Sequence, residues 1–544
     1  MKDAIIIGSG ISGMACAVRC ATQGVHVELV SPYPSEQSQS VMAAGGINAV
    51  LQDHEEGDSV GCHIDDTLKG GCGLGGKTAV TGLCEHAPEI ISYLEKIGTV
   101  FSVDASGHPA RRAFGGQSFK RTCYCGASTG KQIVSALVME VRRLEAAGMI
   151  RRRLRSFFHS ALIKDGVCYG ALLYDEKSRQ LEAVFADALV IAAGGQNALF
   201  GKTTGSSQCD GYAAGKLFLQ GVELKNLEFI QYHPTTLQTP QKRMLISEAV
   251  RGEGGRLFYL ENGKRVYFME EKYGPRGNLV TRDVAAREIW MCPKEVFLDI
   301  SFLGKEAIDR LLPEVRDLCR KYRGIDISEE PIPVAPSVHF FMGGLAVHLN
   351  HETNIRNLFA VGECASMYHG ANRLGGNSLL AALYSGSVAA DGIASGNPAG
   401  SRPDFSEELR SERLLLQEMM ASQSQFPVMY IRDMAAETMN KELGIVRESA
   451  ALEQGISDIS YYQSIAEQIH YDSSVSMYSN YSLTGILALA RATLVCAKER
   501  RESRGSHYRR DYPETDEQMA GATIISYADG EYRVRLDKER SYES

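Results

Sequence analysis

The chain opens with Asp3-Ala4-Ile5-Ile6-Ile7-Gly8-Ser9-Gly10-Ile11-Ser12-Gly13, an apolar run of strand length that breaks directly into a glycine-rich turn. An apolar-periodic run over 14–23 predicts a helix, and a further apolar run over 25–30 predicts a second strand. Strand, glycine turn, helix and strand within about thirty residues form the dinucleotide-binding βαβ unit. In that unit Gly8 permits the tight turn, Gly10 lets the backbone approach a pyrophosphate, and Gly13 lets the helix pack on the strand.

One expected part of this unit is missing. The acidic residue that usually binds the ribose at the end of the second strand is replaced by Ser31. The N-terminus of the predicted helix still offers unpaired N–H groups and a positive dipole end to phosphates. The motif therefore predicts a dinucleotide site without choosing between FAD and NAD.

The overall composition argues against several classes of protein. With 58 basic and 66 acidic residues the net charge is −8, which disfavours a general nucleic-acid surface. No apolar stretch reaches the roughly 18 to 20 residues of a membrane span, and no signal peptide precedes the first strand, so a cytoplasmic protein is expected. The 13 cysteines include no Cys-x-x-Cys pair, so no iron–sulphur cluster, zinc site or other metal ligand is expected.

The order of the predicted elements indicates a large FAD-binding fold. A long glycine-rich loop over 31–76 is expected to wrap on a ligand, because such loops are otherwise rare in compact domains. The elements expected after it are helices over 78–98 and 129–148, three β runs over 160–185 with a hairpin turn at Asp165-Gly166, and a buried strand over 188–195 that ends in a glycine pair.

The second half of the chain indicates an inserted domain and a helical domain. The character changes after about residue 226, and a strand over 357–363 with a helix over 379–393 then resumes the first domain. We therefore predict an α/β fold: a large FAD-binding Rossmann-like domain, an inserted α+β capping domain and a C-terminal helical domain. The predicted boundaries are 1–225 and 341–398 for the FAD-binding domain, 226–340 for the capping domain, 404–503 for the helical domain and 504–544 for a tail with short β-like runs.

Five stretches carry histidine, arginine and hydroxyl side chains flanked by glycine: 231–235, 247–255, 281–283, 337–344 and 369–378. Each has an ordinary structural explanation when it is taken alone. Together they closely resemble the flavoprotein subunits of succinate dehydrogenases and fumarate reductases, a family that also contains L-aspartate oxidase. The resemblance runs from Asp3 to about Ser395, returns over 502–508, and is looser between these parts.

This resemblance implies roles for particular side chains. The residues that match those holding the two carboxylates of a C4 dicarboxylate are His233, Ser247, His339 and Arg373. Arginine suits that task, since its guanidinium pairs bidentately with carboxylate. Arg282 matches the proton donor, because a cation beside a developing carbanion stabilises the charge and supplies the proton. Glu248 and Arg251 match the relay that returns a proton to Arg282.

The same resemblance implies contacts to FAD. The helix that opens at Ser378 and Leu379 would place its positive N-terminal end at the N1/O2 edge of the flavin. Glu363 is expected to bind the sugar or ribityl chain. Because family members often lack the ribose acid, Ser31 fits the same site. The remaining residues expected to bind FAD are Ser38, Gln39, Ser40, Gly45, Gly46, Gly194, Gly195 and Asp210, in addition to Gly8, Gly10 and Gly13.

Two positions depart from branches of this family. Membrane-bound members carry a histidine that bonds covalently to the flavin where this chain has Gln39, so FAD is expected to be non-covalent. An unlinked flavin is expected to have a lower potential, which suits fumarate reduction better than succinate oxidation. Aspartate oxidases carry a glutamate for the substrate ammonium where this chain has Phe114, which therefore fits a dicarboxylate site.

The sequence accordingly predicts the flavoprotein subunit of a fumarate reductase or succinate dehydrogenase, active in electron transport and anaerobic respiration. The alternatives left open are an L-aspartate oxidase and a flavin electron-transfer module with an inactive dicarboxylate site. The expected partners are fumarate or succinate and an iron–sulphur subunit, with no nucleic acid. Membrane contact is expected only through other subunits, at the cytoplasmic face.

Overall fold

Five parallel strands form the central sheet, in the order β19-β10-β1-β2-β6. The computed structural model describes residues 2–53, 55–398, 400–421, 426–466 and 471–539. Because the strands run in parallel, their carboxyl ends meet at one edge, where ligands bind in folds of this type. The strands are β1 (Asp3–Ile7), β2 (His26–Ser31), β6 (Ile150–Leu154), β10 (Ala188–Ile191) and β19 (Leu358–Ala360).

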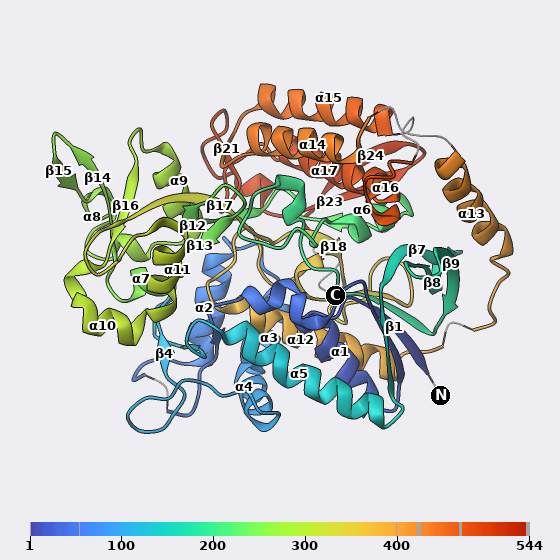
Figure 1. Ribbon diagram of the computed structural model, residues 1–544, viewed down its shortest axis with the longest axis horizontal. Helices are drawn as coiled ribbons and strands as arrows, with labels where there is room; N and C mark the ends of the chain where they lie inside the picture. The colour runs from blue at the N-terminus through green and yellow to red at the C-terminus, as the bar shows by residue number, and fades with distance from the viewer. Residues whose placement is uncertain (1, 54, 399, 422–425, 467–470, 540–544) are drawn as a thin grey trace.

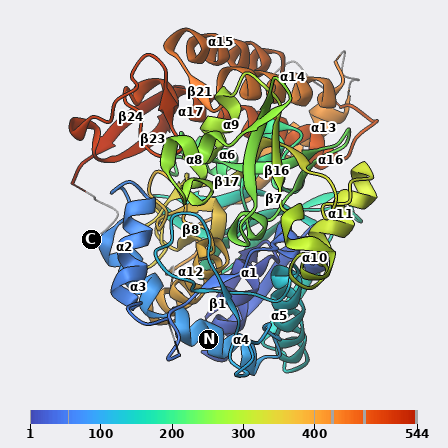
Figure 2. The ribbon, with the colours of Figure 1, turned by 90° about the vertical axis from the view of Figure 1, so that its left-hand side faces the viewer.

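Three helices form a layer on one face of this sheet (Figures 1 and 2). They are α1 (Ile11–Thr22), α5 (Thr129–Ala146) and α12 (Asn377–Ser395). The predicted βαβ unit is thus confirmed, with α1 beginning at Ile11 rather than at residue 14. A Cβ on Gly13 would lie 1.9 Å from the Gly8 carbonyl oxygen, so only glycine allows α1 this close to the turn.

A second sheet lies beside β2 and β10. It is antiparallel and contains β7 (Ser156–Lys164), β8 (Val167–Asp175) and β9 (Gln180–Phe185), as predicted. Asp165 and Gly166 make the predicted turn with positive φ values of 51° and 72°. Helix α13 (Ser406–Ala421) packs on this sheet, apart from the other C-terminal helices (Figure 1).

The region over 31–76 is not the continuous loop that the sequence analysis predicted. Helix α2 (Val60–Gly70) begins after Ser59, whose hydroxyl accepts a hydrogen bond from the Cys62 amide at 3.1 Å. Its apolar periodicity is weak among the glycines, which concealed it. The short strand β3 (Ile47–Asn48) pairs with β5 (Thr122–Cys123), and β5 pairs with β4 (Arg111–Arg112).

The helix predicted over 78–98 is two helices. They are α3 (Lys77–Glu85) and α4 (Ala87–Lys96), and His86 alone separates them. Pro88 lies in the first turn of α4, where its missing N–H costs nothing. The apolar positions keep one phase across the break, which is why periodicity predicted a single helix.

A six-stranded antiparallel sheet over residues 230–341 has its own hydrophobic core and lies at one end of the molecule (Figure 1). Its strands, in the order β13-β12-β17-β16-β14-β15, are β12 (Ile230–Gln238), β13 (Arg243–Leu245), β14 (Arg256–Glu261), β15 (Lys264–Val266), β16 (Val296–Asp299) and β17 (Ile332–Phe341). Its helices are α7 (Ala249–Gly252), α8 (Phe268–Tyr273), α9 (Arg282–Met291), α10 (Gly304–Leu311) and α11 (Pro313–Arg323).

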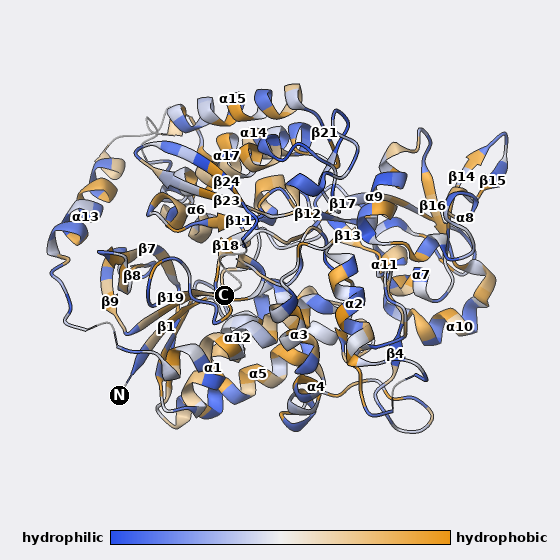
Figure 3. Ribbon diagram, turned by 180° about the vertical axis from the view of Figure 1, so that it is seen from behind, coloured by the Kyte–Doolittle hydropathy of each residue, from blue (hydrophilic) through white to orange (hydrophobic). Residues whose placement is uncertain are grey.

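The C-terminal helices gather above the central sheet. They are α14 (Val428–Glu442), α15 (Ser449–Ala466), α16 (Met477–Tyr481) and α17 (Leu483–Glu499), and α17 packs on α6 (Tyr212–Leu219). In Figure 3 the strands around β1 are mainly orange, whereas most outer helices mix blue and orange, as amphipathic helices do.

The stretch Met477–Glu499 corrects one expectation of the sequence analysis. By length and hydropathy alone it could cross a membrane, and it is the one such stretch among the residues that the structure describes. Of its apolar window, 83% is buried inside the protein, as in a core helix, so the stretch is weak evidence for a membrane span.

The tail returns to the centre of the molecule and completes a five-stranded sheet. β23 (Ala522–Ala528) pairs with β11 (Leu224–Lys225) and with β24 (Glu531–Asp537). The remaining strands of this sheet are β18 (Gly344–Ala346) and β20 (Ala365–Ser366), and β21 (Val446–Arg447) pairs separately with β22 (Tyr508–Arg509). The tail therefore lies against the strand that leads into the 230–341 sheet.

Candidate active site

A cavity of about 520 Å³ runs from the carboxyl edge of the parallel sheet to the 230–341 sheet. Most of the predicted site residues line it, although they come from distant parts of the chain. The predicted residues that line the cavity are Gly8, Gly10, Ser31, Ser38, Gln39, Ser40, Gly45, Gly46, Phe114, Gly194, Asp210, His233, Ser247, Glu248, Arg282, His339, Glu363, Arg373, Ser378 and Leu379.

Three predicted residues lie behind this wall. Gly13 packs against the Gly8 carbonyl, as expected for the glycine that joins helix and turn. A Cβ on Gly195 would lie 2.6 Å from the Glu363 carboxylate, so this glycine makes room for that side chain. Arg251 does not reach the cavity and pairs with Glu248 instead.

The sheet end of the cavity fits a dinucleotide. Gly10 offers no side chain to cap α1. The Ile11 N–H donates to the Ser40 hydroxyl at 3.1 Å, and the N–H groups that follow it in the first turn are suited to an anion. The Ser38 hydroxyl is buried in the wall and has no hydrogen-bond partner in the described part of the chain. A Cβ on Gly8 would lie 2.3 Å from the Ala192 carbonyl oxygen, so only glycine lets the turn lie this close to the end of β10. These features suit FAD, whose flavin supplies hydride chemistry when it is bound.

Three other predicted FAD contacts already bond to protein groups. Asp210 accepts hydrogen bonds from the Tyr478 hydroxyl at 2.9 Å and from the Tyr212 amide at 3.1 Å. The Gln39 carbonyl oxygen accepts one from the Ser206 amide at 2.5 Å. The Ser31 hydroxyl donates to the Tyr33 carbonyl at 2.7 Å. These side chains therefore shape the wall as well as facing the cavity.

A buried ion cluster stands at the other end of the cavity. Arg282, the first residue of α9, donates from Nη2 to Glu248 Oε2 at 2.6 Å and from Nε to the same oxygen at 2.9 Å. Glu248 Oε1 accepts from Arg251 at 3.1 Å and from the Gly115 amide at 2.9 Å. Burial would raise the pKa of the Glu248 carboxyl, but Arg282 and Arg251 outweigh it and lower that pKa to about 2. Glu248 is thus a carboxylate between two guanidinium groups.

Arg373 is buried without a carboxylate partner among the described residues. It donates from Nη2 to Gln231 at 2.9 Å and from Nη1 to the Leu374 carbonyl at 3.3 Å, and no residue that the structure describes bonds to its Nε. Its guanidinium lies 4.4 Å from the centre of the Phe340 ring. Burial and the nearby Arg282 lower the pKa of Arg373. A buried cation in this state attracts an anion.

Gln231 is a site residue that the sequence analysis did not single out. Its carbonyl oxygen accepts from Arg373 and also from Arg282 Nη1 at 3.1 Å. Its amide nitrogen donates to Asn372 and to the Arg373 carbonyl, both at 2.8 Å. Because one amide oxygen bridges the two arginines, it sets their spacing. The available signal was its place in β12 two residues before His233, since residues two apart in a strand lie on the same face.

Two histidines face each other near these arginines, with ring centres 5.1 Å apart. His233 Nδ1 lies 3.0 Å from the Thr235 carbonyl, and His339 Nδ1 lies 2.8 Å from the Thr204 hydroxyl. Burial, together with the nearby cations, lowers the pKa of both, so both rings are neutral. The Thr235 amide also approaches His233 Nδ1, at 3.3 Å, so this nitrogen is held by the backbone of Thr235. The Ser247 hydroxyl accepts from the Ala249 amide at 3.3 Å and keeps its own proton free to donate.

Phe114 closes the wall between the flavin end and the ion cluster. It is 2% exposed, and its amide donates to Gln117 at 3.1 Å. A Cβ on Gly45 or Gly375 would press on its ring at 3.3 Å or 3.0 Å. An ammonium placed here would meet an apolar ring instead of a counter-charge, which disfavours an amino acid substrate.

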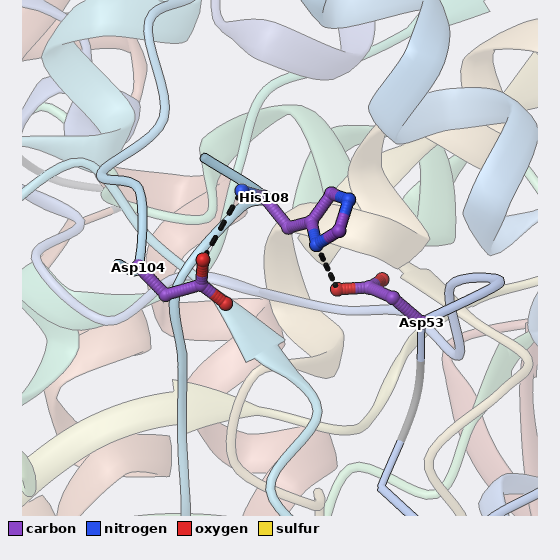
Figure 4. Close-up of side chains that lie close together, drawn as sticks. All are labelled: Asp53, Asp104 and His108. Carbon is purple, nitrogen blue, oxygen red and sulfur yellow. Dashed lines mark hydrogen bonds and ion pairs between the residues drawn. The ribbon is translucent and has the colours of Figure 1, made fainter. Parts of the chain in front are cut away.

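A separate group of acids and a histidine lies outside this cavity (Figure 4). His108 Nδ1 lies 3.3 Å from Asp53, and Asp104 accepts from the His108 amide at 3.2 Å. Asp53 also pairs with Arg111 at 2.8 Å. Because both carboxylates already have protein partners, we assign no metal to this group.

Comparisons with known proteins agree with this geometry. The family model described as FAD binding domain matches residues 3–379, and the one described as Fumarate reductase flavoprotein C-term matches residues 432–542. The chain is 35% identical to the succinate dehydrogenase flavoprotein subunit of Bacillus subtilis (strain 168), over 96% of this chain and 93% of that one. It is 32% identical to the fumarate reductase flavoprotein subunit of Haemophilus influenzae, over 95% of this chain and 90% of that one.

A solved structure gives the same result. A variant of E. coli quinol fumarate reductase superposes with a TM-score of 0.90 at 29% identity, covering 98% of this chain and 96% of that chain. The predicted fold class is thereby confirmed, and so is the prediction of FAD as cofactor. The chain belongs to the family of FAD-dependent flavoprotein subunits of succinate dehydrogenases and fumarate reductases.

Proposed function

We propose that this chain reduces fumarate to succinate with non-covalent FAD, and that Arg282 protonates the product carbon. The observation that carries the proposal is the buried Arg373 without a carboxylate partner among the described residues, beside the Arg282–Glu248 pair. A dicarboxylate would supply the counter-charge that Arg373 lacks. Bound FAD supplies the hydride, and the protein groups bind, orient and protonate.

The roles of the side chains follow from their donors. Arg373, His339 and Ser247 line the cavity and would hold the carboxylates, with His233 beside them. Phe114 excludes water on one side, which strengthens these charge interactions. Gln231 keeps the binding and protonating arginines apart, so that one can clamp while the other faces carbon.

Arg282 is suited to protonation because of its neighbours. Its contacts to Glu248 provide a route for replacing a proton lost to carbon: the Glu248 carboxylate would take a proton from Arg251 and pass it on to Arg282. Since both partners are buried, the route is shielded from bulk water over this distance. The proton on Arg282 would matter only as negative charge develops on carbon.

Fumarate reduction driven by an artificial donor tests these roles. Arg282→Lys should lower kcat by about a thousandfold or more with little change in the Kd for fumarate, because the interaction forms only in the transition state. Arg373→Lys should raise that Kd about tenfold or more, since the bidentate clamp acts in both states. Near-normal kcat in Arg282→Lys would remove it from the mechanism.

The prediction of non-covalent FAD stays a proposal, and it is supported by Gln39, which lines the cavity and has no group that links to flavin. Acid precipitation should release all the flavin into the supernatant. Flavin fluorescence that stays with the denatured chain would contradict it.

We also expect fumarate reduction to run much faster than succinate oxidation on one preparation, because an unlinked flavin has the lower potential.

We further propose that an iron–sulphur subunit delivers the electrons, since the relatives bear the names of subunits of larger enzymes. The chain would then act at the cytoplasmic face of the membrane, held there by its partners. Purifying the chain from its own source and identifying what accompanies it tests this. A chain that is fully active alone with its physiological donor would contradict it.

A further inference from the structure

The turn over 373–377 carries two parts of the site at once. Arg373 stands at its start, and α12, which faces the flavin end with Ser378 and Leu379, begins at its end. The position of this turn therefore sets both the carboxylate clamp and the N-terminus of α12. What holds the turn decides the geometry of the site.

Asn48, on the short strand β3, holds the turn from behind. Its side-chain nitrogen donates to the Gly375 carbonyl and to Asn377 Oδ1, both at 2.7 Å. Its backbone N–H donates to the Gly376 carbonyl at 3.2 Å. A Cβ on Gly376, which has a φ of 84°, would lie 2.0 Å from Asn48 Oδ1, so the turn lies flush on this amide.

The other side of the same amide is fixed as well. Asn48 Oδ1 accepts from Gln117 at 2.8 Å and from the Thr122 hydroxyl at 2.6 Å. The amide cannot be reversed, because its oxygen would then oppose the Gly375 carbonyl. Asn48 is 0% exposed and does not line the cavity, so it touches neither substrate nor cofactor.

Gln117 connects this arrangement to the wall of the site. Its carbonyl oxygen accepts from the Phe114 amide at 3.1 Å, and its nitrogen donates to the Gly375 carbonyl at 3.1 Å. On the far side, Asn377 accepts from His63 at 3.1 Å and donates to Thr67 at 2.9 Å. Burial lowers the pKa of His63 to about 4, so this ring is neutral near pH 7, and Nε2 carries its proton.

We propose that Asn48 is a positioning residue, which sets the turn that carries Arg373 and the N-terminus of α12 toward the dicarboxylate and the flavin. The inference rests on the proposed function for its substrate. Only a side chain with two donors on one side and an acceptor on the other satisfies all four partners. An aspartate has the same shape but would direct oxygen at two oxygens.

The test compares matched Asn→Asp changes in the FAD-loaded protein. Asn48→Asp should raise the Kd for fumarate, read from flavin difference spectra, about tenfold or more, since small displacements of a clamp cost this much. The control is Asn480→Asp, because Asn480 is also buried and donates to two carbonyls, those of Asp472 and Ser476, neither of which belongs to the turn. It should leave the Kd within about twofold at a similar loss of Tm.

A milder variant tests the same inference if Asn48→Asp does not fold. Thr122→Val keeps the shape of the side chain and removes one hydrogen bond to Asn48, so the Kd should rise by a smaller factor in the same direction. An unchanged Kd in both variants, or an equal change in Asn480→Asp, would overturn the inference.

The flavin gives a readout that does not depend on fumarate. Displacing the N-terminus of α12 should shift the flavin absorption and midpoint potential in Asn48→Asp but not in Asn480→Asp. Wild-type protein that neither binds nor reduces fumarate would refute the proposed function alone, and the flavin comparison would then decide. An unshifted flavin in Asn48→Asp would overturn the inference in that case.

Discussion

Glu363 is a titratable residue in the wall of the cavity, where its carboxyl group is buried. Its carboxylate accepts from the Phe341 amide at 3.1 Å, and burial raises its pKa to about 7, against an ordinary value of 4.5. The folded protein therefore keeps a proton that the unfolded chain releases between these values. Stability from this group is present below pH 4.5 and is lost as the pH rises to 7.

This predicts a pH-dependent difference between FAD-free wild type and Glu363→Gln, which does not titrate. From pH 4.5 to 7 the wild type should lose up to about 3 kcal/mol relative to the variant, because each pKa unit corresponds to about 1.4 kcal/mol. Thermal unfolding of both proteins across this range measures it. A constant difference in Tm would show that Glu363 does not titrate there.

At the same scale, residue types predicted more of the site than residue positions did. Arginine, histidine and glycine in five stretches marked the cavity because their chemistry is unusual in cores. Gln231 and Asn48 were missed, since an amide in a strand reads as ordinary polar spacing. Their importance comes from partners such as Arg373 and Gly375, which lie far away in sequence.

At the scale of elements, a hydrogen bond in the wall of the cavity joins α11 to the segment just before α5. Glu314, in the first turn of α11, accepts from the Ala127 amide at 3.1 Å, just before α5 begins. Ala127 precedes Ser128, the N-cap residue of α5, whose side chain makes no cap, so this carboxylate fixes the chain where it enters α5. Glu314 and Ala127 both line the cavity.

This contact predicts that Glu314→Ala increases local motion in the cavity wall around Ala127 and has little effect on the stability of the whole fold. The free energy of unfolding should fall by about 1 kcal/mol or less, because the group is exposed. Amide exchange over 126–130 should speed up, and the KM for fumarate should rise a few-fold. The matched control is Glu306→Ala, because Glu306 lies in the first turn of α10 and has no hydrogen bond or ion pair with another element among the described residues. Equal exchange in both variants would contradict the prediction.

Elements were predicted well where one period governed them, as in β1, α1 and α5. They were mispredicted where two periods shared a phase or where glycine diluted the pattern. α3 and α4 join at His86 with their apolar faces in register, so only Pro88 marked the break. The pairing of β23 with β11 could not be predicted, since nothing local specifies a partner about three hundred residues away.

At the scale of the whole molecule, one buried ion cluster ties the C-terminal helices and the tail to the strand that enters the 230–341 sheet. Arg500, at the end of α17, donates to Glu228 at 2.5 Å and to Glu502 at 2.8 Å. It also donates to the Gly521 carbonyl at 2.8 Å and to the Thr523 hydroxyl at 2.7 Å. Arg500, Glu228 and Glu502 are all 0% exposed.

This cluster predicts that Arg500→Met destabilises the whole protein. Removing the cation takes from Glu228 its ion-pair partner and leaves Glu502 paired with Arg504, and a broken buried pair costs about 3–5 kcal/mol. The control is Arg510→Met, because Arg510 makes an exposed pair with Glu448 at 3.3 Å, which should cost less than about 1 kcal/mol. The Tm of each variant, measured by thermal unfolding, compares the two, and the amount of flavin that each protein retains is a second probe. Equal Tm values would show that the tail is held by its strand pairing alone, with the charges near balance.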